Sequence, residues 1–195
     1  MAGGDVNGGS PVSSLFAPAI NVFCNLSSNL DMDRRKHTLT GLTACGGQGW
    51  EEKNQSTTCE TLNTKTGEWQ VSSTFKLSHY DHVAWNTSKG ILLMGGYTNP
   101  YNTTWILQDG TSMQGFNLVE ASFYSCAVPD PRSESVIVTG GFDAAKNNGS
   151  GEWLRSAIRY GENGFIEYLP EKIRAIHYGC AGYYNNAGSL VTYSL

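Results

Sequence analysis

The segment Ile91-Leu92-Leu93-Met94-Gly95-Gly96 ends a hydrophobic run in a glycine doublet, and this pattern repeats along the chain. Leu42-Thr43-Ala44-Cys45 precedes Gly46-Gly47, and Val136-Ile137-Val138-Thr139 precedes Gly140-Gly141. With Gly3-Gly4 near the first residue, the doublets recur at spacings of 43, 49 and 45 residues. Each run is continuously hydrophobic rather than alternating, which predicts a strand buried on both faces. A fixed period of this length indicates a repeat architecture.

Other features keep the same period. Each doublet is followed by a polar loop and a strand-like segment, and then by a turn in which an aromatic residue follows glycine. The strand-like segments are 57–62, 103–107 and 154–160, and the turns are 65–69, 114–116 and 162–165. Four short strands per period, joined by turns, are the unit of a β-propeller blade.

An Arg-x-x-His element precedes the first strand of a period. It occurs as Arg34-x-x-His37 and Arg174-x-x-His177, while His79-x-x-His82 and Ser122-x-x-Ser125 fill the same slot. In this order the landmarks resemble kelch repeats over nearly the whole chain, and most closely those of extracellular invertebrate kelch-type proteins. The resemblance implies an all-β fold of propeller blades, each of four antiparallel strands.

The resemblance also divides the chain. Residues 37–81, 82–124 and 125–176 are expected to form complete blades. Residues 1–36 would supply the third and fourth strands of another blade, and residues 177–195 the first and second strands of a further one. Kelch propellers usually have six blades, so we expect an incomplete, open propeller whose edges need the missing blades. Closure into a four-bladed ring is the alternative.

The repeated residues have structural roles in this interpretation. The glycine doublets tolerate positive φ and close approach of neighbouring chains. An aromatic residue in the fourth strand, Trp69 in the best-matching repeat, is expected to plug the space between sheets. The arginines and histidines are expected to hydrogen-bond backbone carbonyls where blades meet; anion binding by an arginine is the alternative. These residues are Arg34, His37, His82, Arg174 and His177.

Composition excludes several classes of protein. Of the 195 residues, 23 are glycine and only 15% are charged, with a net charge of −4. The longest basic cluster is Arg34-Arg35-Lys36, so the basic stripe of a nucleic-acid-binding protein is missing. No run approaches the roughly 18 apolar residues of a membrane span.

Cysteines and glycosylation motifs bear on location. Cys45 ends one strand and Cys59 lies in the next, which favours a disulfide over two buried free thiols. Cys24, Cys126 and Cys180 are an odd remainder, so at least one is free or has lost its partner. A disulfide indicates an oxidising compartment. We therefore expect an extracellular protein whose signal peptide lies outside this chain; a cytoplasmic location is the alternative.

Five Asn-x-Ser/Thr motifs agree with that location. They begin at Asn25, Asn54, Asn86, Asn102 and Asn148. Asn54, Asn102 and Asn148 are expected in loops between second and third strands, on one rim of the propeller, where glycans would restrict docking. Asn86 is expected in a hairpin between first and second strands, and Asn25 near a third-to-fourth connection.

The function favoured by these features is binding without catalysis. Aromatic residues in otherwise polar loops of that rim are the candidate contacts for a protein partner, a glycoprotein included. They are Trp50, Tyr97, Tyr101, Phe142 and Trp153. No cofactor is expected, and His79-x-x-His82 lacks a third ligand at a usual zinc spacing. The alternatives are an intracellular adaptor, as in cullin-based ubiquitin ligases, and a fragment of a copper enzyme similar to galactose oxidase.

Overall fold

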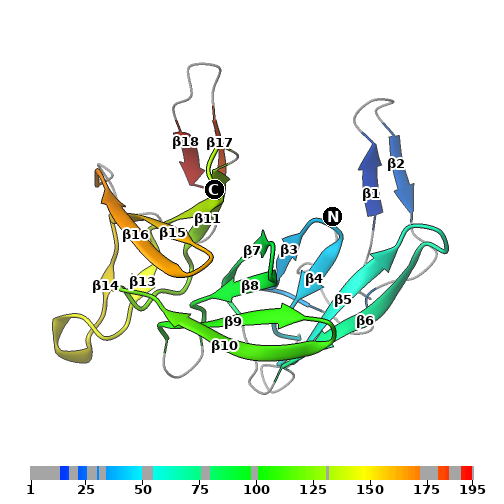
Figure 1. The fold of residues 1–195 in the computed structure, drawn as a ribbon, viewed down its shortest axis with the longest axis horizontal. Helices are drawn as coiled ribbons and strands as arrows, with labels where there is room; N and C mark the ends of the chain where they lie inside the picture. The colour runs from blue at the N-terminus through cyan, green and yellow to red at the C-terminus, as the bar shows by residue number, and fades with distance from the viewer. Residues whose placement is uncertain are drawn as a thin grey trace. The chain divides into compact units, whose positions relative to one another are not determined.

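A computed structural model of the chain shows an all-β protein (Figure 1). It describes residues 14–17, 22–25, 30, 34–49, 55–75, 80–97, 101–130, 132–171, 180–184 and 190–194. Within these ranges, one turn of 3-10 helix, η1 at Asn147–Gly149, is the only helical element. The chain forms two compact units, residues 1–80 with 109–112, and residues 81–108 with 113–195.

Three four-stranded sheets form most of the described fold. In each, four strands are hydrogen-bonded in chain order. The first sheet contains β3 (Thr38–Thr40), β4 (Thr43–Cys45), β5 (Thr58–Asn63) and β6 (Glu68–Thr74). The second contains β7 (Val83–Thr87), β8 (Gly90–Met94), β9 (Thr103–Gln108) and β10 (Thr111–Asn117). The third contains β11 (Cys126–Asp130), β12 (Ser135–Thr139), β15 (Ala157–Gly161) and β16 (Gly164–Leu169).

Shorter antiparallel pairs complete the described strands. A ribbon of β13 (Phe142–Asp143) and β14 (Glu152–Trp153) is inserted between β12 and β15. Two hairpins stand near the chain ends: β1 (Ser14–Ala17) with β2 (Val22–Asn25), and β17 (Cys180–Tyr184) with β18 (Leu190–Ser194).

The hydrophobic runs before the glycine doublets are the buried second strands, as predicted. Every residue of β4 and of β12 is buried, and so are Leu92, Leu93 and Met94 of β8. Each of these strands has a partner strand on either side, so both of its backbone edges are paired within its sheet. Burial of both faces explains why the runs do not alternate.

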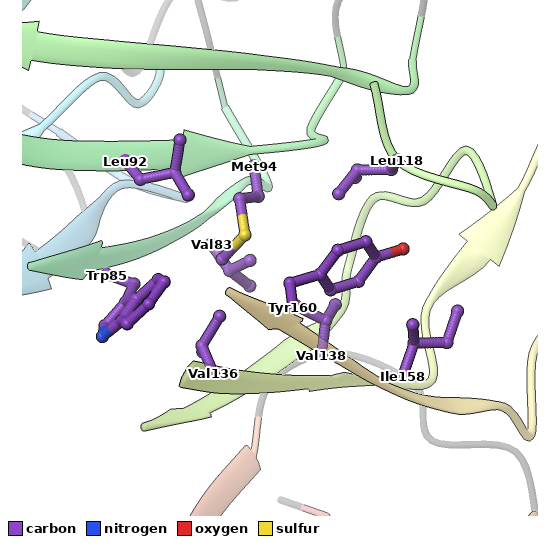
Figure 2. Close-up of a cluster of buried hydrophobic side chains, with 9 residues drawn as sticks. All are labelled: Val83, Trp85, Leu92, Met94, Leu118, Val136, Val138, Ile158 and Tyr160. Atoms are coloured by element: carbon purple, nitrogen blue, oxygen red, sulfur yellow. The ribbon is translucent and has the colours of Figure 1, made fainter. Parts of the chain in front are cut away.

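A hydrophobic core fills the space between the second and third sheets, inside the second unit. Figure 2 shows side chains of β7 and β8 pointing toward those of β12 and β15. Phe116 of β10 stacks on Tyr160 with ring centroids 5.8 Å apart, an aromatic plug of the predicted kind. The buried members are Val83, Trp85, Leu92, Met94, Leu118, Val136, Val138, Ile158 and Tyr160. Full burial of one such side chain contributes about 1.5–3 kcal/mol of transfer free energy.

In two of the doublets the second glycine, Gly47 or Gly141, allows a tight turn to pack against it. A Cβ on Gly47 would lie 2.8 Å from the carbonyl oxygen of Arg35, and one on Gly141 would lie 2.7 Å from that of Phe123. Both glycines have positive φ, 94° and 91°. Lys36, which follows Arg35, and Tyr124, which follows Phe123, also have positive φ. The same local backbone therefore recurs in the two turns.

One predicted turn is wrong. The segment 114–116 lies inside β10, and the chain instead reverses at Asp109-Gly110, where φ is 50° and 78°. An Asp-Gly pair with positive φ at both positions forms the two-residue type I′ turn that matches the twist of a hairpin. Gly115 has another role: its Cβ would stand 2.5 Å from the Thr104 hydroxyl oxygen.

Candidate binding surface

The ribbon β13–β14 positions two of the predicted loop aromatics. Phe142 and Trp153 are paired in register, so their side chains lie on the same face, with ring centroids 5.1 Å apart. Gly151 leaves room for the Phe142 ring, because a Cβ there would meet ring carbons at 2.0 Å. The backbone of the ribbon thus holds both rings in place.

A second segment, Ser122–Ser125, adds two rings that sequence reasoning did not select. The backbones of Phe123 and Phe142 exchange two hydrogen bonds. The nitrogen–oxygen distance is 3.2 Å where Phe123 donates and 2.8 Å where Phe142 donates. Tyr124 donates its backbone N–H to the carbonyl of Asp81 at 3.1 Å. Its side chain stacks beside Trp153 with centroids 6.1 Å apart. The sequence feature that could have indicated them is the aromatic pair within Ser122-Phe123-Tyr124-Ser125.

The loop between β8 and β9 contributes Tyr97 and Tyr101. Their ring centroids lie 5.5 and 5.7 Å from that of Phe123, and 5.6 Å from one another. Phe123 also lies 4.9 Å from Tyr124 and 5.4 Å from Phe142. One continuous aromatic surface results, which consists of Tyr97, Tyr101, Phe123, Tyr124, Phe142 and Trp153.

Exposure within the aromatic surface is graded. Phe123 is 7% exposed and anchors the cluster, whereas Tyr97 is 46% exposed; the other members are half-buried. Desolvation, together with the charge and hydrogen bond of Tyr97, raises the pKa of Tyr101, so its hydroxyl stays protonated. Rings with apolar faces and polar tips suit contact with a partner that is partly apolar.

A charged border lies beside the ribbon. Lys146 donates to a carboxylate oxygen of Glu120 at 3.0 Å, and the Ser156 hydroxyl donates to the other oxygen. Partial burial acts to lower the pKa of Lys146, but the hydrogen bond to Glu120 and the charges of Glu120, Glu152 and Asp143 outweigh it and raise that pKa. Lys146 therefore stays charged at the edge of the aromatic surface.

Arg34 precedes β3 and is buried against the first sheet, and it is not part of the aromatic surface. Its guanidinium donates to the backbone carbonyls of Gly46 and Thr58, at 2.8 and 3.0 Å, and to the carboxylate of Glu60. The hydroxyl oxygens of Ser56 and Thr58 accept hydrogen bonds from other N–H groups of the same guanidinium. With these partners every N–H of the side chain is used, which favours the structural interpretation over anion binding.

The predicted disulfide between Cys45 and Cys59 is confirmed. The two residues face one another across β4 and β5, with Cα atoms 4.1 Å apart. Cys126 is also disulfide-bonded. At least one of the three cysteines outside the Cys45–Cys59 pair is therefore bonded. Cys24 and Cys180 stand in β2 and β17, where only the backbone is described.

The glycosylation motifs differ in their surroundings. Asn148 is exposed in η1, and Asn86 is exposed in β7, opposite Ile91, rather than in the hairpin turn itself. Asn102 is half-buried and donates its side-chain amide to the carbonyl of Leu118 at 3.5 Å. Asn25 ends β2 and pairs with Ser14, which places it at the end of the hairpin away from the predicted connection.

Some predicted residues lie outside the described residues. These are Trp50, Asn54, His79, Arg174 and His177. In the part of the chain that is described, no three His, Cys, Asp or Glu side chains come close enough together to hold a metal ion. Nor does that part contain a helix with the length and apolar character needed to cross a membrane.

Comparison with known proteins shows a similarity of fold. No family model matches the chain, and no curated protein matches it. Among solved structures, the fold is similar to one described as "Structure of YjhT", with a TM-score of 0.64 and 11% sequence identity. The alignment covers 94% of this chain and 72% of that chain. At this identity the likeness concerns the fold alone.

Proposed function

We propose that the chain is part of a kelch-type β-propeller that binds a protein partner through its aromatic surface and catalyses no reaction. Each complete repeat corresponds to one four-stranded sheet. The backbone also supports the assignment, because Gly47 and Gly141, in the first and third complete repeats, each pack against a turn that contains a residue with positive φ. The kelch assignment rests on that recurrence and on the order of the motifs.

The observation that carries the binding function is the aromatic surface itself. Its rings come from three separate segments and converge on Phe123, while Tyr97 is 46% exposed. Tyrosine and tryptophan dominate the energetic centres of protein interfaces because they bury a large area at little cost in side-chain entropy. A rigid sheet scaffold with variable loops is a common way to display such rings.

An extracellular location fits this function. Disulfides persist where the surroundings are oxidising, and both Cys45 with Cys59 and Cys126 are disulfide-bonded. Asn86 and Asn148 are exposed at glycosylation motifs. In the cytosol the cysteines of an intracellular adaptor would be kept reduced. The disulfides therefore favour an extracellular location.

The test uses the full chain against an array of purified secreted and cell-surface ectodomains from the source organism. We expect Tyr97→Ala and Trp153→Ala to weaken binding to a partner by about tenfold or more, as hot-spot substitutions do. Tyr168→Ala is the matched control, because Tyr168 is 57% exposed on β16, outside the aromatic surface. Thermal unfolding should shift little for Tyr97→Ala and Tyr168→Ala. A partner whose affinity falls only for Tyr168→Ala would contradict the proposal.

A further inference from the structure

A cavity of about 330 Å³ lies at the hairpin end of the third sheet, within the second unit. Residues of two turns line it, the turn between β11 and β12 and the turn between β15 and β16. It lies away from the aromatic surface, because these hairpins and the loops after the second strands occupy opposite ends of a sheet. Its size falls in the range of about 300–1,000 Å³ that is typical of ligand pockets.

The lining of this cavity carries negative charge. Among the described residues that line it, the ionisable side chains are those of Glu134 and Glu162. The backbone N–H and the hydroxyl of Ser88 donate to the Glu162 carboxylate and hold its pKa below the ordinary value, so it stays ionised. Lys89 contacts one lining residue, because it donates to the side-chain oxygen of Asn163 at 2.6 Å. Two carboxylates against one ammonium leave a net negative charge, which attracts a cationic group.

The other wall of the cavity is apolar. It consists of Phe165 and Ile166, which are 45% and 51% exposed. The Phe165 ring is held between those of Tyr160 and Tyr168, with centroids 6.5 and 5.3 Å away. An aromatic ring beside carboxylates suits a planar cation, which stacks on the ring while its N–H groups donate to the oxygens. The guanidinium of arginine has this combination of properties.

The outer strand of the third sheet departs from the pattern of the other two. Among their described residues, β6 exposes one large apolar side chain, Val71, and β10 exposes one, Met113, whereas β16 exposes Phe165, Ile166 and Tyr168. Single exposed apolar residues are normal, but a group of them marks an interaction site. Because this group extends along β16 beyond the cavity, the occupant is larger than a free cation. A protein partner that presents the cation fits both features.

We propose that this cavity binds the side chain of an arginine on a protein partner. The guanidinium stacks on the ring of Phe165 and donates hydrogen bonds to the carboxylates of Glu134 and Glu162, while its methylene groups contact Ile166. Lysine fits less well, because its ammonium has no planar face and fewer donors. This site is separate from the aromatic surface, so the two surfaces can be tested independently.

The experiment selects random peptides, displayed on phage, on the immobilised full chain after depletion on a double variant, Glu134→Gln with Glu162→Gln. We expect the recovered peptides to share an arginine beside an apolar residue. Each is then synthesised with citrulline, which keeps the shape of arginine but not its charge, and its binding is measured by fluorescence anisotropy. Citrulline should weaken binding by roughly tenfold or more, because hydrogen bonds from a charged donor are lost.

Variants of the chain locate the site, and thermal unfolding reports whether each is folded. Phe165→Leu and either single glutamine variant should weaken peptide binding by roughly two- to fivefold. Glu167→Gln is the matched control. It removes the same charge from the same sheet, but Glu167 pairs with Arg159 at 2.9 Å and lies outside the cavity lining, so binding should not change.

Several outcomes would overturn the proposal. They are recovery of no peptide, recovered peptides without arginine, and folded Phe165→Leu and glutamine variants that bind like the parent. Ser88→Ala keeps the Glu162 carboxylate but removes one contact between the hairpins, so a loss equal to that of Glu162→Gln would assign the effect to packing and overturn the site. A loss in Tyr97→Ala with none in Phe165→Leu would place the peptides on the aromatic surface, which supports the function proposed above but not this site.

Discussion

Replacing Glu60 by glutamine would leave the guanidinium of Arg34 charged and buried without its counter-ion. The two side chains are 0% and 1% exposed and are joined by hydrogen bonds from both Nε and Nη2 of the arginine. Glutamine keeps the shape of the side chain but not its charge. The substitution therefore tests the electrostatic contribution of the carboxylate with little change in packing.

The expected loss is large for a single substitution. Breaking a buried ion pair by removing one partner typically costs 3–5 kcal/mol, because the remaining charge is uncompensated. For a chain of this length each kcal/mol corresponds to a fall in Tm of about 2–4 °C, so the fall should be roughly 6–20 °C. Against a total stability of about 5–15 kcal/mol, this is enough to compromise folding.

Urea unfolding followed by tryptophan fluorescence measures the effect. We expect a lower midpoint with an unchanged m-value, which marks a loss of native-state stability. Glu171→Gln is the matched control. It removes the same charge from the pair with Arg155, whose side chains are 57% and 65% exposed at an N–O distance of 3.2 Å. Exposed pairs are worth little, so the control should change stability by less than about 1 kcal/mol.

Equal losses for Glu60→Gln and Glu171→Gln would refute the reasoning. A double variant, Arg34→Met with Glu60→Met, supplies a second check. It removes both charges at once, and apolar replacement of a buried ion pair is often close to neutral. We expect it to be more stable than Glu60→Gln. A double variant less stable than the single one would show that the hydrogen bonds of Arg34 to backbone carbonyls outweigh its charge.

Other predictions concern backbone, thiols and pH. Gly141→Ala should destabilise more than Gly149→Ala, measured by urea unfolding: φ is similar, 91° and 88°, but only the first places a methyl 2.7 Å from a carbonyl oxygen. Equal losses would show that φ alone matters. Alkylation of the denatured, unreduced chain should find one thiol, because Cys126 is bonded in addition to one cysteine pair; three thiols would contradict this. The pKa of Glu162 should lie below its ordinary value of 4.5, because the backbone N–H and hydroxyl of Ser88 bind its carboxylate. The stabilisation that the ionised Glu162 provides is present above its unfolded-state pKa and is lost as pH falls through its folded-state pKa. Ser88→Ala should raise that pKa in an NMR titration, and an unchanged value would contradict the assignment.

Part of the candidate site could be predicted from loop position alone. Tyr97, Tyr101, Phe142 and Trp153 follow glycine doublets, and the period places such loops at one end of the sheets. Their convergence on Phe123 could not be predicted in this way. It depends on backbone hydrogen bonds between the Ser-x-x-Ser segment and the ribbon β13–β14, which join residues far apart in sequence.

The sequence by itself determined the local structure. Continuous hydrophobic runs indicate strands buried on both faces, and glycine doublets allow the positive φ that ends them. The pairing of Cys45 with Cys59 also followed, because both lie on adjacent strands. Only the tertiary structure decided which polar groups are buried together, such as Arg34 with Glu60. The physical reason is range: backbone propensity and periodicity act over a few residues, whereas burial and ion pairing depend on packing between segments that are distant in the chain.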